Sequence, residues 1–239
     1  MPVDGNTDEL KRTNEIKMAI PLLDALDICG KHITADALLT QRELAQYIVQ
    51  RGAHYHFAVK ANQPQLLEDL TFYFQHRQAP EFVEVSPPEH GRIETRKIWT
   101  TTALTGYLNF PHLAQASLIE REVVHKKSGK QTHELAYMIT SSPVQPGNAQ
   151  RLLRINRGHW SIENSCHYPL DWTWDEDRSR IRTGHGPENI TRLRRFAITV
   201  IKSKPVRNLA QKIRQLNRDT RLVFDYLCMS QNAQRAATP

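Results

Sequence analysis

Between residues 14 and 77 the apolar residues switch repeatedly between helical and strand spacing, and this limits the fold more than any other feature of the sequence. Ile16, Ile20 and Leu23 repeat at helical intervals, whereas HITADALL is a short apolar run of the kind that forms a buried strand. The pattern predicts helix, strand, helix, strand and helix, at 14–27, 32–39, 41–51, 54–61 and from Pro64 onward. Strands that alternate with helices form parallel crossovers, so we expect an α/β sheet.

The remainder of the chain is predicted to differ from this first part. Residues 81–142 are rich in strand-forming residues and contain the turn sequence KKSGK, which indicates an antiparallel, β-rich insertion. Helical spacing returns at about 149–164, 187–202 and 206–228. The expected organisation is a flexible tail, an α/β part, a β-rich insertion, a C-terminal helical part and a second tail, at 1–12, 13–80, 81–148, 149–229 and 230–239.

Positive charge is concentrated in one segment. Residues 178–221 hold 13 Lys and Arg against 2 Asp and Glu, a net of +11, whereas residues 1–177 hold 18 against 22, a net of −4. A dense basic segment is suited to bind the phosphate backbone of a nucleic acid, because each neutralised phosphate releases condensed counterions. A solvated basic face is the alternative interpretation, and charge alone does not separate the two.

The three cysteines and the N-terminus bear on the compartment. Cys29, Cys166 and Cys228 are far apart and show no C-x-x-C spacing, so neither a disulfide framework nor a zinc ribbon is indicated. The sequence contains neither a secretory leader nor an apolar run of membrane-spanning length. We therefore expect a cytoplasmic, nucleoid-associated protein with no membrane partner.

Two acidic residues are candidates for metal chemistry. Asp36 falls at the carboxyl end of a predicted strand, where open α/β sheets bind ligands, although such an Asp is usually a cap or a salt-bridge partner. Glu163, in HWSIEN, follows Arg154 and Arg157, although a helical Glu usually faces solvent. Mg²⁺ and Mn²⁺ prefer carboxylate oxygens as ligands, and two such ions commonly catalyse phosphodiester cleavage. Two carboxylates make a poor site of this kind and three a usable one.

Other clusters give weaker signals. His54 and His56 share one strand face, and His159, Cys166 and His167 are close in sequence, but their spacing matches no known zinc site and polar surface is the simpler interpretation. The acidic residues Asp171, Asp175, Glu176 and Asp177 directly precede the basic segment, so we expect internal charge pairing there.

Several motifs together resemble one known family. They are NEI at 14–16, TADALLTQ at 34–41, VKANQPQLLEDL at 59–70, HGRIETR at 90–96, HWSIEN at 159–164 and EDRSRIR at 176–182. In this order they are similar to the ISAs-type, H-repeat-associated DDE transposases of insertion sequences. The resemblance implies an RNase H-like fold with a β-rich insertion, and an Asp-Asp-Glu triad that cuts and rejoins DNA with Mg²⁺.

The resemblance assigns roles to individual residues. It makes Asp36 the second Asp of the triad and Glu163 its Glu, and places Lys60, Asn62 and Gln63 close to the substrate. Residues expected to contact DNA are Lys60, Asn62, Arg154, Arg157, His159, Arg182, Arg192, Arg194 and Arg195.

The sequence departs from the family pattern in two places. Related transposases carry a Tyr-Arg-Glu-Lys signature around the Glu of the triad. Here Asn156, His159 and Leu170 stand where that signature has Tyr, Arg and Lys, so it is not intact. The first Asp of the triad, normally on the first strand, has no counterpart, because Asp4 is too close to Asn14 to leave room for the strands between. We therefore expect an N-terminally truncated transposase with an incomplete RNase H-like core lacking its first strands, a partial or inactive copy that acts on DNA and can form homo-oligomers. The alternative is a non-enzymatic DNA-binding remnant that interferes with an intact transposase.

Overall fold

The computed structural model describes residues 7–88, 91–160, 168–176 and 178–229, with the side chains of residues 7–14 left aside. Contacts divide the chain into two compact units, residues 1–159 and 160–239, and each is described by itself. Within the described residues, no helix is long and apolar enough to cross a lipid bilayer.

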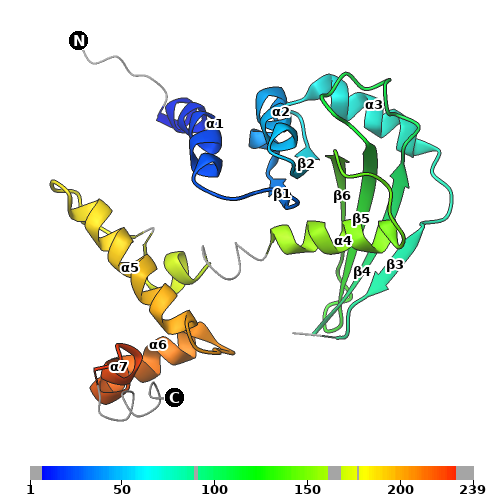
Figure 1. Ribbon diagram of the computed structural model, residues 1–239. Coiled ribbons are helices and arrows are strands. Elements are labelled where there is room, and N and C mark those ends of the chain that lie inside the picture. Colours follow the sequence, from blue (N-terminus) through cyan, green and yellow to red (C-terminus); the bar gives the residue numbers. More distant parts are fainter. Residues whose placement is uncertain (1–6, 89–90, 161–167, 177, 230–239) are drawn as a thin grey trace, which may run out of the picture. The chain divides into compact units, whose positions relative to one another are not determined.

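A single six-stranded sheet forms the centre of the first unit (Figure 1). Its order is β1-β2-β6-β5-β4-β3; β1 and β2 are parallel, as predicted, and every other neighbouring pair is antiparallel. The strands of the expected β-rich insertion are therefore antiparallel, and they extend the α/β sheet through the pairing of β2 with β6. The strands are β1 (His32–Ala35), β2 (His54–Val59), β3 (Phe82–Val85), β4 (Arg92–Thr101), β5 (Gln115–His125) and β6 (Gln131–Thr140).

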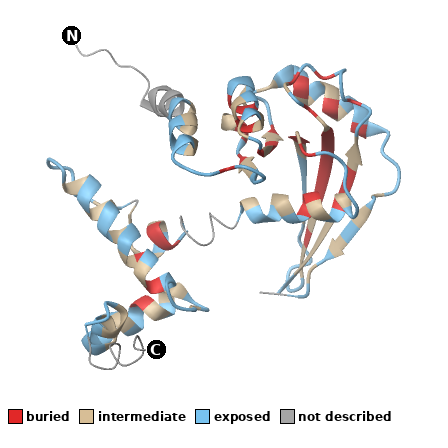
Figure 2. Ribbon diagram, viewed as in Figure 1, coloured by how far each residue is buried: buried red, intermediate tan, exposed pale blue. Residues whose placement is uncertain are grey.

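Helices pack on both faces of this sheet. On one face lies the larger core, in which Tyr55, Phe57, Leu70 and Leu118 are fully buried, as the red segments of Figure 2 show. On the opposite face Ile98 and Ile119 pack against Leu152 and Leu153, because successive side chains of a strand point to opposite sides. The helices are α2 (Arg42–Gln50) and α3 (Pro64–Gln75) on the first face and α4 (Asn148–His159) on the second, while α1 (Thr7–Asp24) packs against α2.

Two predicted elements near the N-terminus differ in extent. The first helix begins at Thr7, inside the segment 1–12 that was expected to be a flexible tail. The strand predicted at 32–39 ends at Ala35, and Ala37–Leu39 form a 3₁₀ turn, η1. This strand was expected to be buried, but β1 is an edge strand in which Ala35 alone is buried.

The second unit is helical. It contains one π-helical turn, η3 (Pro169–Thr173), and the helices α5 (Gly186–Lys202), α6 (Leu209–Arg218) and α7 (Thr220–Tyr226). The single helix predicted at 206–228 was wrong, because Asp219 has an extended backbone and caps α7, its carboxylate accepting hydrogen bonds from the amides of Arg221 and Leu222. The expected tail at 230–239 lies outside the described residues.

Candidate functional site

Asp36 directly follows β1, so its side chain projects beyond the carboxyl end of a parallel strand. The carboxyl group is 66% exposed, and it makes no capping bond to η1, the turn that it precedes. The first of the two ordinary roles for such a residue, a helix cap, is therefore excluded. The second ordinary role, contact with a basic side chain, is filled by His159. The rest of the exposed carboxylate lies at the edge of the sheet where open α/β folds bind ligands.

His159 holds Asp36 from the neighbouring helix. Its Nε2 lies 3.3 Å from Asp36 Oδ1, and its Nδ1 lies 3.2 Å from the hydroxyl of Thr34, two residues earlier on the same face of β1. A neutral ring with its proton on Nε2 donates to Asp36 and accepts from Thr34, so one tautomer satisfies both contacts. The ring is thereby held at the end of β1 by Thr34 of that strand and by Asp36 directly after it.

The position of α4 follows from its apolar face. Ala149, Leu152 and Leu153 are buried against β4 and β5, and this packing directs the helix so that its last residue, His159, reaches β1. Arg157, two residues before the end of α4, is engaged: its Nη1 lies 2.8 and 2.7 Å from the two carboxylate oxygens of Glu84 on β3. Arg154 is exposed and has no ion-pair partner among the described residues.

The loop after Asp36 is tied to the segment between β2 and α3. The amide of Asn62 donates to the carbonyl of Ala37, and Gln63 Nε2 donates to the carbonyl of Thr40 at 2.8 Å. Thr40 is itself fully buried, and its hydroxyl donates to the carbonyl of Ala58 at 2.7 Å. The side-chain amides of Asn62 and Gln63 thus hold the loop that follows the candidate metal ligand, and their expected place close to the substrate stays a prediction. Lys60 is exposed at the end of β2.

Three histidines lie on the α4 side of β1 and β2. His32 Nδ1 and His56 Nε2 are 2.9 Å apart, and the ring of His32 stacks on that of His54 with centroids 5.4 Å apart. Burial, together with the charges of His32, Arg151 and His54, lowers the pKa of His56 to about 3. His56 is therefore neutral at pH 7, and the pair bonds as two uncharged rings.

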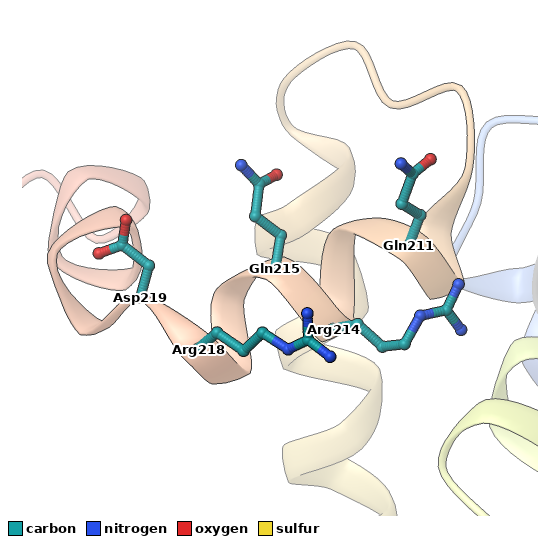
Figure 3. A pocket seen from close by; sticks show the side chains of 5 residues that line it. All are labelled: Gln211, Arg214, Gln215, Arg218 and Asp219. Carbon is teal, nitrogen blue, oxygen red and sulfur yellow. The ribbon is translucent and has the colours of Figure 1, made fainter.

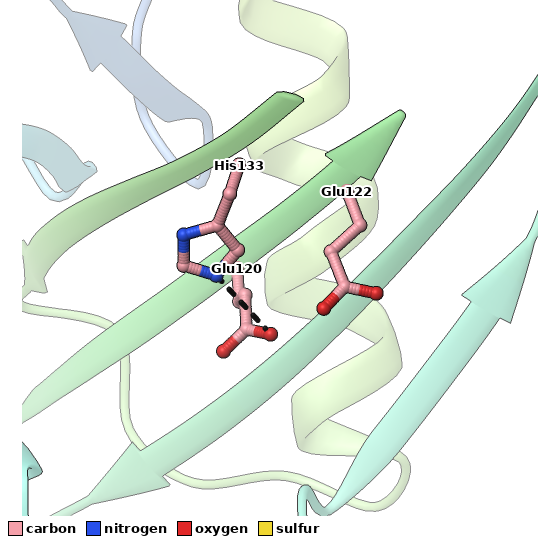
Figure 4. A group of neighbouring side chains, drawn as sticks. All are labelled: Glu120, Glu122 and His133. Atoms are coloured by element: carbon pink, nitrogen blue, oxygen red, sulfur yellow. Dashed lines mark ion pairs between the residues drawn. The ribbon is translucent and has the colours of Figure 1, made fainter. Parts of the chain in front are cut away.

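A second group with metal-ligand chemistry occurs on β5 and β6, where Glu120, Glu122 and His133 converge (Figure 4). Glu120 is already paired, with Arg77 Nη2 at 3.1 Å and Lys97 Nζ at 3.0 Å, and Lys97 also reaches Glu122 at 3.0 Å. Burial alone would raise the pKa of Glu120, but the hydrogen bonds from Lys97 and Arg77 lower it to about 2. A cation would have to displace Lys97, so this group is a salt-bridge network. The sequence did not indicate this group, because its members come from three different strands and from the turn after α3.

The remaining predicted residues lie in the second unit or outside the described part. Glu163, Cys166, His167 and Asp177 fall in undescribed segments. Arg192 pairs with Glu188 at 2.5 Å, Asp175 with Arg178 at 3.6 Å, and Glu176 accepts from Thr191 at 2.6 Å. Arg194 is half-buried, whereas Arg182 and Arg195 are exposed. The expected charge pairing of the acidic cluster is present at Asp175.

Comparison with known proteins identifies the class to which this fold and site belong. The family model described as "Transposase DDE domain" matches residues 7–200, which is most of the chain. The chain belongs to this family of transposases, and the mixed α/β sheet is consistent with the RNase H-like fold of the domain.

Individual relatives agree with this assignment. The chain is 28% identical over 240 residues to "Putative protein YbfL" of Escherichia coli (strain K12), covering 95% of this chain and 63% of the relative. It is 28% identical over 236 residues to "H repeat-associated putative transposase YhhI" of the same organism, covering 94% and 61%. A third relative, "H repeat-associated putative transposase YbfD", is 38% identical over 98 residues, 39% of each chain. The chain therefore spans about three fifths of the length of the first two relatives.

Proposed function

We propose that this chain acts on DNA as a transposase, with Asp36 and Glu163 as ligands of a Mg²⁺ or Mn²⁺ ion that serves DNA strand cleavage and strand transfer. The observation that supports this most directly is the exposed, uncapped carboxylate of Asp36 beyond the carboxyl end of β1. Mg²⁺ takes only one or two carboxylates from a protein and fills its other positions with water and phosphate oxygens. When bound, the ion would stabilise the charges that develop on the phosphodiester.

The protein's own groups would hold and orient the site. His159 fixes one oxygen of Asp36, which leaves the other oxygen to face a cation. Asn62 and Gln63 hold the backbone that follows Asp36, and such supporting contacts preserve the geometry of a ligand. We infer that Lys60 and Arg154, which are both exposed, contact the phosphate backbone, together with Arg182, Arg192, Arg194 and Arg195 of the basic segment.

The experiment is metal-dependent nicking of a supercoiled plasmid by the full chain, with Mn²⁺ or Mg²⁺ supplied. We expect nicking that is lost in Asp36→Asn and Glu163→Gln and kept in Asp27→Asn. Asp27 is a matched control, because it is an exposed Asp that only accepts a hydrogen bond from the amide of Cys29, which Asn also accepts. Nicking that persists in Asp36→Asn contradicts the proposed role of this residue.

The second candidate is a non-enzymatic DNA-binding protein that interferes with an intact transposase. The net charge of +11 in residues 178–221 favours it, since such binding needs only phosphate contacts. It predicts that DNA binding weakens steeply with salt, that the protein does not nick the plasmid, and that Asp36→Asn leaves DNA binding unchanged. Homo-oligomer formation is part of both proposals, because an interfering protein would share the dimer surface or the DNA of the intact enzyme.

A further inference from the structure

Helix α6 has one apolar and one polar face. Ile213 is buried, and Leu209 and Leu216, one turn to either side, are half-buried, so this face packs within the helical unit. The helix begins at Asn208, whose side chain accepts a hydrogen bond from the amide of Gln211 at 2.9 Å. Because the cap and the apolar face fix both the start and the rotation of α6, the side chains of its other face have defined positions.

The polar face presents a row of four long side chains that is two residues wide. Gln211 and Gln215 are four residues apart, as are Arg214 and Arg218, and all four are exposed. Together with Asp219 they line an open hollow of about 400 Å³. Figure 3 shows the two glutamines extending from one flank of α6 and the two arginines from the adjoining flank.

The two arginines of this row keep their charge available. No carboxylate of the described residues lies within ion-pair distance of Arg214 or Arg218, in contrast to Arg192, which pairs with Glu188. Asp219, the carboxylate in the hollow, is occupied with the amides of Arg221 and Leu222 at the start of α7. The polar face of α6 therefore carries two free guanidinium groups one turn apart.

The glutamines are partly oriented. Gln215 Oε1 accepts a hydrogen bond from Lys212 Nζ at 3.1 Å, and the ammonium of Lys212 lies 5.5 Å from the ring centroid of Tyr226. This contact leaves the amide NH₂ of Gln215 directed away from Lys212. The row thus combines forked guanidinium donors with amides that both donate and accept.

We infer that α6 enters the major groove of duplex DNA, with Gln211, Arg214, Gln215 and Arg218 against the edges of the bases. This inference rests on the proposed action on DNA, and it adds a surface of the protein that recognises the base sequence. The major groove is about 12 Å wide and admits one α-helix; Arg forms paired hydrogen bonds with guanine and Gln with adenine. Backbone contacts from the surrounding basic segment would supply affinity without sequence preference.

The experiment is selection of duplexes from a random-sequence library by the full chain, followed by measurement of Kd for the selected duplex and for a random duplex. The variant Arg214→Lys/Arg218→Lys keeps both charges and helix propensity and loses only the planar fork. The matched control is Arg178→Lys/Arg180→Lys, which makes the same change at two exposed arginines outside α6. We expect the wild type and the control to enrich the same sequence.

For the α6 variant we expect nearly unchanged Kd for the random duplex and a preference for the selected duplex that falls about tenfold or more. A wild type that enriches no sequence, or an α6 variant that keeps the full preference, overturns the inference while leaving the proposed action on DNA intact. Failure of the wild type to bind any duplex at low salt contradicts the proposed function itself, so the two failures are distinguishable.

Discussion

His159 Nε2 lies 3.3 Å from Asp36 Oδ1, so the last residue of α4 contacts a residue 123 positions earlier in the chain. The contact joins the end of an edge strand to the end of the helix that packs on the second face of the sheet. A ring fixed in this way by Asp36 and Thr34 restricts the carboxylate to one orientation. The geometry of the candidate metal centre therefore depends on α4 as well as on β1.

We expect His159→Ala to lower the affinity of the protein for Mn²⁺ by roughly 10-fold or more, because supporting groups that orient a ligand commonly contribute this much. His159→Gln should recover part of the affinity, since its amide can still donate to Asp36. Isothermal titration with Mn²⁺ measures the effect. The control is His185→Ala, a His whose side chain is 90% exposed, and an equal loss in that variant would contradict the role of His159.

We expect Thr40→Val to destabilise the first unit by about 1–3 kcal/mol, because the carbonyl of Ala58 would lose its buried donor. Val nearly matches Thr in shape, so the change removes a hydrogen bond without opening a cavity. Urea unfolding, followed through the tertiary signal of the first unit, gives the free energy. Thr199→Val, at an exposed Thr in α5 that donates to the carbonyl of Arg195, should have an effect within about 0.5 kcal/mol.

His56 should make the stability of the first unit depend on pH. Burial lowers its pKa in the folded state to about 3, below the ordinary value of 6.5, so its contribution is complete above pH 6.5 and is lost as the pH falls toward 3. The slope should approach about 1.4 kcal/mol per pH unit within this window. His56→Gln should flatten the profile of unfolding free energy against pH, and the exposed control His76→Gln should not. Identical profiles for His56→Gln and the wild type would show that the ring titrates normally.

Glu120 should act in a lower pH window. Its pKa of about 2 lies below the ordinary 4.5, so the stability it contributes is present above pH 4.5 and is lost as the pH falls toward 2. Glu120→Gln should cost about 1–3 kcal/mol at pH 7, because Lys97 and Arg77 would lose a charged partner. Glu134→Gln, whose side chain is 63% exposed, is the control. If the variant Lys97→Ala bound Mn²⁺ more tightly than the wild type, the carboxylates of Glu120 and Glu122 would form a metal site, and this would contradict their assignment to a salt-bridge network.

Much of the fold could be predicted from local pattern, because each of the first five elements shows its own apolar period. The parallel pairing of β1 with β2 followed from this alternation and is confirmed. The sequence could not show that β6 would pair with β2, since that contact joins segments about 80 residues apart through hydrogen bonds that leave no periodic signal. It also missed the break at Asp219, where one capping side chain overrides a continuous helical pattern.

The candidate site was partly predictable for the same reason. Asp36 was singled out by its place at the end of a strand, and the resemblance singled out Asn62 and Gln63, whose bonds to the loop after Asp36 no local pattern predicts. The contact of His159 with Asp36 depends on how α4 packs against Ile98 and Ile119, which no local pattern reports. The row on α6 was present in the sequence as Gln and Arg at helical spacing, and a helical-wheel inspection of 209–218 would have found it.

The proposal that Asp36 and Glu163 share one metal ion is tested most directly by replacing Mg²⁺ with Fe²⁺ and generating hydroxyl radicals at the bound ion with ascorbate and peroxide. The radicals cut the backbone next to the ion, and mass spectrometry of the fragments locates the cuts. We predict cuts close to both Asp36 and Glu163, suppressed together by excess Mg²⁺ and absent in Asp36→Asn. Cuts confined to one of the two positions, or unchanged in Asp36→Asn, would contradict a shared metal centre.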